Sequence, residues 1–104
     1  MKNYEFSDVY WTNPEYEIAV KNGIVYIDYY CIVSGGVGAH AFNVAILPPE
    51  IVPTHRIRSS AWAANGNSQR VAASLDIQTN GLIQFVSGGD FVEAGFTISY
   101  LVNS

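Results

Sequence analysis

Hydrophobic positions along this chain recur in short runs that suit β-strands, and no stretch shows the spacing of an amphipathic helix. β-branched and aromatic residues dominate these runs, and Gly, Pro and Asn separate them. The even spacing of short strands predicts an all-β fold, either a two-sheet antiparallel β-sandwich or a jelly roll. The predicted strands are Ile18–Lys21, Ile24–Val33, Ala41–Leu47, Arg56–Ala63, Gln69–Gln78, Leu82–Val86 and Phe96–Val102, with Glu5–Trp11 as a weaker candidate.

The pattern also predicts how two turns are built. Asn22–Gly23 separates two hydrophobic runs, and this dipeptide favours a tight hairpin turn. Near Gly81, a two-residue loop would set Ile77 against Gln84 and mix apolar and polar side chains on one face. A three-residue loop pairs Ile77 with Ile83 instead and keeps the apolar face together. We therefore predict the three-residue loop, with Gly81 in the left-handed conformation.

The segment Ala45–Arg58, AILPPEIVPTHRIR, interrupts the strand pattern with three prolines. Pro48, Pro49 and Pro53 cannot donate a hydrogen bond to a sheet ladder. We therefore expect the chain to leave one sheet within this segment and to enter the other.

Composition adds the expectation of a partner chain. The 104 residues are close to the modal size of a domain, so we expect residues 1–104 to form a single domain. Hydrophobic residues make up 49% and charged residues only 13%, against about 25% charged in an average domain. The strand Ile24–Val33 also carries apolar residues on both faces, whereas a strand with one wet face should alternate. We therefore predict an obligate oligomer.

The charge of the chain limits its partners and is unevenly distributed. The net charge of −4 and the pI near 4.8 argue against nucleic-acid binding, which needs a basic face. Arg56, Arg58 and Arg70 lie in a span, Ile51–Leu75, that holds no acid. Either these charges are spaced by chance and solvated, or an acidic face meets a basic face across a subunit boundary. The acids that gather in the first part of the chain are Glu5, Asp8, Glu15, Glu17 and Asp28.

The span Tyr29–Pro49 contains no Asp, Glu, Lys or Arg, which raises the question of a membrane segment. Glycines and polar residues interrupt the span, and its apolar residues follow strand periodicity. We therefore expect no membrane partner.

The strongest candidate for a binding surface is the predicted strand that ends near Trp62. Period-two alternation puts Arg56, Arg58, Ser60 and Trp62 on one face of that strand. An indole can stack on the C–H face of a sugar ring, and guanidinium groups can bind its hydroxyls or phosphates. Phosphate-decorated wall polysaccharides would suit the two arginines best. The alternative is that Trp62 plugs the edge of the core and the arginines pair with acids of a neighbouring subunit.

Three further residues could join this surface. Asn65 and Asn67 lie in the polar loop that follows Trp62, and amides match the donors and acceptors of a sugar, although a plain connecting loop is the favoured reading. His55 lies beside the basic strand. His40 and His55 have no acidic or thiol neighbours in the sequence, so we predict neither a metal nor a cofactor.

The sequence gives no sign of catalysis. It contains no Gly-x-Ser-x-Gly elbow, and its single cysteine, Cys31, falls in the middle of an apolar strand where a buried thiol is expected. Asp28, Asp76, Asp90 and Glu93 show no spacing that would pair two carboxylates for glycoside cleavage. We therefore predict no catalytic residue and no enzymatic activity, with a small hydrolase as the least favoured reading.

Four motifs in order resemble a known family of viral proteins. These are KNGIVY at Lys21–Tyr26, ILP at Ile46–Pro48, LDIQTNG at Leu75–Gly81 and ISYLV at Ile98–Val102. Their order and spacing, from Trp11 onward, resemble the C-terminal head domain of tail receptor-binding, baseplate and tail-fibre proteins of phages that infect Gram-positive bacteria.

This resemblance implies a homotrimeric β-sandwich or jelly roll at the tail tip or baseplate of a virion. Such heads often bind a saccharide of the host cell surface, so the implied function is adhesion without turnover. The alternative is a structural module that trimerises or attaches a tail fibre or multidomain protein and has no ligand of its own. The trimeric stem of the family does not precede Met1, so we expect either an excised head or a stem in another polypeptide.

Overall fold

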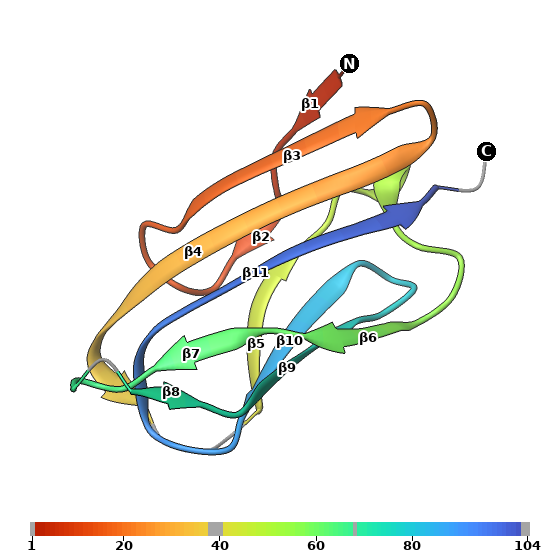
Figure 1. Ribbon diagram of the computed structural model, residues 1–104. Coiled ribbons are helices and arrows are strands. Elements are labelled where there is room, and N and C mark those ends of the chain that lie inside the picture. The colour runs from red at the N-terminus through yellow and green to blue at the C-terminus, as the bar shows by residue number, and fades with distance from the viewer. Residues whose placement is uncertain (1, 38–40, 68, 103–104) are drawn as a thin grey trace.

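The computed structural model describes residues 2–37, 41–67 and 69–102, and within these the strands form two antiparallel sheets packed face to face (Figure 1). The predicted all-β, two-sheet fold is therefore confirmed. The six-stranded sheet contains, in spatial order, β1 (Lys2–Tyr4), β3 (Glu15–Lys21), β4 (Ile24–Val37), β11 (Phe91–Leu101), β7 (Trp62–Ala64) and β8 (Arg70–Val71). The five-stranded sheet contains β2 (Asp8–Val9), β5 (Ala41–Ile46), β10 (Leu82–Ser87), β9 (Ala73–Ile77) and β6 (Ile57–Ser60).

The core lies between the sheets, where each long strand presents every second side chain. In β4 the inward residues, from Val25 to Cys31, are buried. The outward residues are not: Tyr26 is 46% exposed and Ile32 62% exposed. The apolar sequence of β4 predicted that both of its faces are buried. In the single chain only the inward face is buried. The second apolar side of β4 lies on the outer face of the six-stranded sheet.

Both predicted turns are confirmed. Lys21 pairs with Ile24 across a two-residue turn, and both turn residues have positive φ, 54° at Asn22 and 76° at Gly23. In the β9–β10 hairpin Ile77 pairs with Ile83, as the three-residue loop requires. Gly81 has a φ of 94°, which only glycine adopts readily.

The expectation that the proline-rich segment changes sheets is wrong. β5 before it and β6 after it both belong to the five-stranded sheet. Between them a short 3-10 helix, Pro49–Ile51, buries Ile51. The segment also packs on the β9–β10 hairpin, because the amide of Leu47 donates to the carbonyl of Gly81 at 2.9 Å. The prolines end the ladder of β5, and the chain then crosses the end of the same sheet.

Two changes of sheet occur at alanines inside runs that the sequence predicted as single strands. The predicted strand Arg56–Ala63 is broken at Ala61 into β6 and β7, which lie in different sheets. The predicted strand Gln69–Gln78 is broken at Ala72 into β8 and β9, again in different sheets. The alternation of side chains between the two faces holds only within one strand. It therefore cannot be extended across Ala61 or Ala72, where the chain passes from one sheet to the other.

The uncharged span from Tyr29 to Pro49 contributes to β4, β5 and the start of the 3-10 helix. In the part of the chain that the structure describes, no helix is both long and apolar enough to cross a membrane.

Candidate functional site

The side chains of Tyr30 and Trp62 form a stacked aromatic pair on the outer face of the six-stranded sheet, which we call the aromatic platform. The register of β4, β11 and β7 sets Tyr30 opposite Gly95 and Gly95 opposite Trp62. The two ring centroids are 5.7 Å apart and the ring planes differ by 24°. A Cβ at Gly95 would lie only 2.7 Å from the indole, so glycine is needed for this close approach. Trp62 therefore lies on the outer face and does not plug the core.

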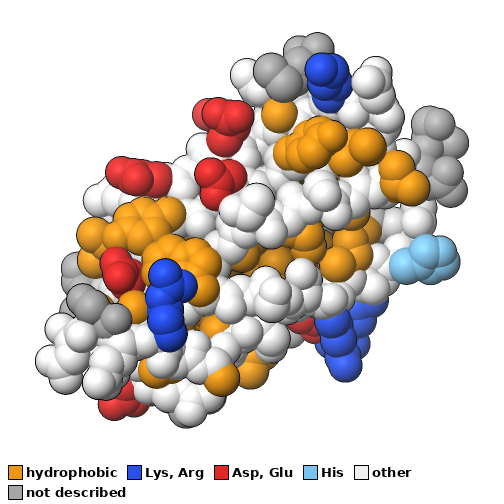
Figure 2. Space-filling view, in the orientation of Figure 1, with side chains coloured by type: hydrophobic (Ala, Val, Ile, Leu, Met, Phe, Trp, Pro, Cys, Tyr) orange, Lys and Arg blue, Asp and Glu red, His pale blue; other side chains and the backbone are white. Residues whose placement is uncertain are grey.

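Two charged side chains border the aromatic platform. The guanidinium carbon of Arg70 lies 4.9 Å from the centroid of the Trp62 ring, which is the geometry of a cation–π contact. The hydroxyl of Tyr30 donates a 2.9 Å hydrogen bond to the Glu93 carboxylate, and this bond raises the pKa of the phenol. Figure 2 shows a basic side chain lying across hydrophobic side chains near one end of this face, with acidic side chains beside them.

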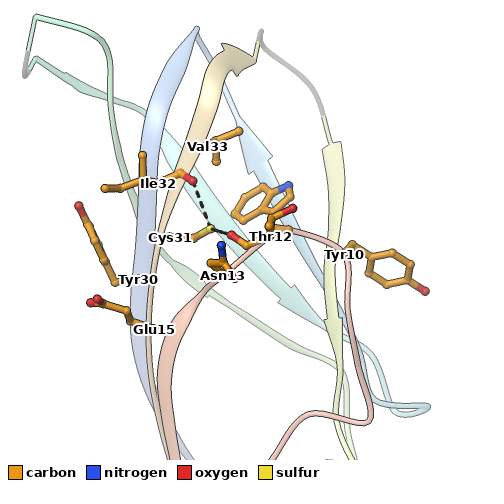
Figure 3. A pocket seen from close by; sticks show the side chains of 9 residues that line it. Tyr10, Thr12, Asn13, Glu15, Tyr30, Cys31, Ile32 and Val33 are labelled. Atoms are coloured by element: carbon orange, nitrogen blue, oxygen red, sulfur yellow. Dashed lines mark hydrogen bonds between the residues drawn. The ribbon is translucent and has the colours of Figure 1, made fainter.

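A pocket of about 550 Å³ adjoins the platform and shares Tyr30 with it. The pocket exists because β3 begins at Glu15, opposite Tyr30, whereas β4 runs on to Val37 and leaves its edge uncovered. Figure 3 shows Glu15, Tyr30 and Ile32 together on one side of β4, with Tyr10 pointing away on the far side of the pocket. The remaining lining residues are Trp11, Thr12, Asn13, Cys31 and Val33.

The structure does not bring Arg56, Arg58 and His55 beside Trp62, because the predicted strand that joined them is broken at Ala61. Arg56 and His55 precede β6 and Arg58 lies within it, whereas β7 belongs to the other sheet. Figure 1 shows β6 and β7 one after the other along the sandwich, with β7 nearer its left end.

Arg56 has a partner within its own chain, the carboxylate of Asp76. Its Nε donates to one oxygen of the Asp76 carboxylate at 2.8 Å, and a terminal nitrogen donates to the other oxygen. This bidentate bond lowers the pKa of Asp76, and Arg58, which faces Asp76 across the β6–β9 ladder, acts in the same direction. Arg58 and His55 remain exposed.

The two predicted asparagines have different environments. The side-chain oxygen of Asn65 accepts hydrogen bonds from the backbone amides of Asn67 at 2.9 Å and Gln69 at 3.1 Å. Asn65 therefore shapes the β7–β8 connection, and its acceptor is already used. Asn67 is exposed next to the platform strands.

The outer faces of the two sheets differ in charge. Glu15, Glu17 and Asp28 lie on the six-stranded sheet, where Glu17 faces Asp28 across β3 and β4. The exposed arginine of β6, Arg58, lies on the five-stranded sheet. Arg70, by contrast, lies on the six-stranded sheet with these acids. Figure 2 shows acidic side chains over β3 and β4.

The described side chains include neither an accessible thiol nor a cluster of metal ligands. Cys31 is buried, its thiol donates to the Thr12 carbonyl at 3.6 Å, and burial raises the pKa of that thiol. No group of three or more His, Cys, Asp and Glu residues that could hold a metal occurs within the described ranges.

Sequence reasoning identified Trp62 but missed Tyr30, Arg70, Glu93 and Gly95. These residues meet only through the pairing of β4, β11 and β7, which joins segments that are far apart in the sequence. One signal was available: Gly95 is an isolated glycine in an apolar run, and such a glycine often marks a close approach.

Comparison with known proteins identifies the fold. No family model matches the sequence, and no curated protein matches it. A solved structure does match: the head domain of phage bIL170, one of the receptor-binding domains of lactococcal phages, with a TM-score of 0.67. The match covers 98% of this chain and 98% of that chain at 14% sequence identity. The predicted resemblance to phage receptor-binding heads is thus confirmed for the fold.

Proposed function

We propose that this chain is the receptor-binding head of a phage tail or baseplate protein, which attaches the virion to a saccharide on the host surface without turnover. The observation that carries the proposal is the similarity in fold to a phage head domain along almost the full length of both chains. Function also depends on the site, since one fold hosts many functions. The aromatic platform supplies that site.

The platform has the chemistry that a sugar needs. We expect the C–H face of a sugar ring to stack on the half-buried rings of Tyr30 and Trp62. Glu15 and Glu93 offer carboxylates beside Tyr30, and the adjoining pocket of about 550 Å³ can receive a neighbouring sugar unit. Trp62 thus stays in the proposed site, and Asn67, exposed in the loop after β7, remains a candidate at its edge, while Arg58 and His55 lie away from it.

A homotrimer would raise the strength of attachment. A shallow, exposed platform binds one saccharide weakly, but three linked copies on a spike raise the effective concentration for each further contact. The outer face of the six-stranded sheet supports assembly, because Tyr26 and Leu101 are 46% and 73% exposed at the end of that face away from the platform.

The second candidate is a structural module that trimerises or attaches a tail fibre and has no ligand of its own. It is favoured by the internal use of Arg56 and Asn65, two of the residues whose types first pointed to sugar binding. In that case the exposed apolar side chains would serve assembly alone.

Binding to cell-wall preparations separates the two functions. We expect Trp62→Ala to weaken binding of the purified protein by about fivefold or more, since aromatic stacking contributes about 1 kcal/mol for each head. Arg58→Ala is the matched control, because Arg58 is exposed and remote from the platform. Circular dichroism would verify that both variants fold.

A wild-type protein that binds no wall preparation would support the structural module. Loss of binding in Arg58→Ala with full binding in Trp62→Ala would instead place the receptor site at β6.

A further inference from the structure

The aromatic platform is flanked by two carboxylates. Glu93 accepts the hydrogen bond of the Tyr30 hydroxyl at 2.9 Å. Glu15 faces Tyr30 directly across the β3–β4 ladder and lies on the same side of β4 in Figure 3. An aromatic ring between two carboxylates attracts a cation twice, through the negative face of the ring and through the charges beside it.

The protein already places a cation of its own on this platform. The Arg70 guanidinium lies 4.9 Å from the centroid of Trp62. Within the described residues the ion pair is the one between Arg56 and Asp76, so Arg70 lies over the indole without a carboxylate in salt-bridge range. The contact indicates that the ring itself favours positive charge.

The wider surface has the same preference. Glu17 and Asp28 continue the acidic row along the face that carries the platform. Arg58, which could attract a phosphate, lies on the other sheet. The carboxylates of Glu15, Glu17, Asp28 and Glu93 near the platform outnumber the guanidinium of Arg70, which favours a cationic over an anionic ligand.

We propose that the aromatic platform recognises an ammonium group on the receptor, held over Tyr30 between Glu15 and Glu93, with the rest of the ligand in the adjoining pocket. This inference rests on the proposed function and specifies its ligand as positively charged, in place of the phosphate-bearing saccharide that the sequence favoured. The ammonium could belong to an amino sugar or to an alkylammonium substituent, and the test distinguishes these sources.

The direct test is titration of the purified protein with matched soluble probes. A glucosamine tetramer carries free ammonium groups, an N-acetylglucosamine tetramer has the same rings without the charge, and glucose 6-phosphate carries negative charge. Choline represents the alkylammonium source. We expect the glucosamine tetramer to bind about fivefold or more tightly than its acetylated counterpart, with the difference shrinking as salt rises from about 20 to about 200 mM. Binding by choline alone would identify the alkylammonium source.

A variant of Arg70 gives the sharpest discrimination. Arg70→Ala removes the cation that competes for the platform, so it should tighten binding of an ammonium probe about two- to fivefold. If the ligand were anionic, the same variant would weaken binding.

Glu15→Gln combined with Glu93→Gln keeps the shapes of both side chains and should weaken ammonium binding about fivefold or more. Arg58→Ala serves as the control on the remote face.

The inference and the proposed function can fail separately. Wall fragments that bind equally well after chemical N-acetylation of their amines, or tighter binding of the acetylated or phosphorylated probe, would overturn the ammonium site and leave saccharide adhesion standing. Failure of all probes to bind would overturn the ammonium site as well. If wall fragments also failed to bind, adhesion itself would be refuted.

Discussion

The aromatic platform depends on a single residue without a side chain. A Cβ at Gly95 would lie 2.6 Å from the Tyr29 carbonyl oxygen and 2.7 Å from the Trp62 indole, and backbone cannot retreat as a flexible side chain can. Glycine therefore sets the height of the indole above the sheet. Alternation along the sequence places Trp62 on one face of its strand, but it cannot identify the residues that lie beneath and beside the indole.

We expect Gly95→Ala to displace Trp62 and to destabilise the fold by about 1–3 kcal/mol, the usual cost of forcing extra volume into a close contact. Saccharide binding should fall with it. Denaturant unfolding and tryptophan fluorescence would measure both effects. Gly66→Ala is the matched control, because nothing lies within 4 Å of a Cβ there. Equal stability of the two variants would contradict the packing of Trp62 on β11.

The ion pair of Arg56 and Asp76 predicts a pH effect. Because the hydrogen bonds from Arg56 lower the pKa of Asp76 in the folded state, the carboxylate stabilises the fold above its unfolded pKa of about 3.9. That stabilisation is lost as the pH falls through the lower folded value.

Asp76→Asn should therefore lower the thermal midpoint at pH 7, with a difference from wild type that shrinks below about pH 4. Thermal unfolding followed by circular dichroism across this range would measure it. A difference that stayed constant with pH would refute the pair.

At the scale of elements, local signals predicted the hairpins and failed at the crossings between sheets. Turn chemistry at Asn22–Gly23 and the apolar face around Ile77 are encoded within a few residues, so both registers could be derived. The sheet change at Ala61 depends on long-range pairing, because β6 pairs with β9 and β7 pairs with β11. The residues around Ala61 carry no local signal for this pairing. Proline marked the end of β5 correctly, but the sheet that β6 joins is decided by long-range pairing.

The β9–β10 turn provides a test at this scale. Gly81→Val combines a φ of 94° with a Cβ only 3.0 Å from the Leu47 carbonyl oxygen, so we expect a loss of about 3 kcal/mol in unfolding free energy. Gly23→Ala separates the two causes, since Gly23 also has positive φ but open space around its Cβ position. It should cost only about 1 kcal/mol in denaturant unfolding. A Gly81→Val variant as stable as wild type would contradict the turn.

For the whole molecule, the two outer faces of the sandwich carry different kinds of residues. The platform and the carboxylates of Glu15, Glu17 and Asp28 lie on the outer face of the six-stranded sheet. The outer face of the five-stranded sheet carries a row of amides, in which Gln84 is hydrogen-bonded to both Asn43 and Gln78. The prediction of an oligomer came from an apolar content that exceeds what one thin core requires. The structure locates the excess on the outer face, at Tyr26, Ile32 and Leu101.

We expect Tyr26→Asp to weaken trimer formation about tenfold or more, because it would bury a charge in the subunit contact. Light scattering over a dilution series would measure the change in mass. Val86→Asp, an exposed apolar position on the other sheet, is the control and should leave the mass unchanged. A wild-type chain that stays monomeric at every concentration would refute the trimer.

The proposed function is tested most directly by locating where the receptor saccharide contacts the protein. Mapping the shifts of backbone amide resonances during titration with cell-wall fragments would locate that contact. We predict the largest shifts at Tyr30, Trp62 and Gly95, on three adjacent strands of one sheet. Shifts confined to Arg58 and its neighbours on β6, or spread evenly over both sheets, would contradict it.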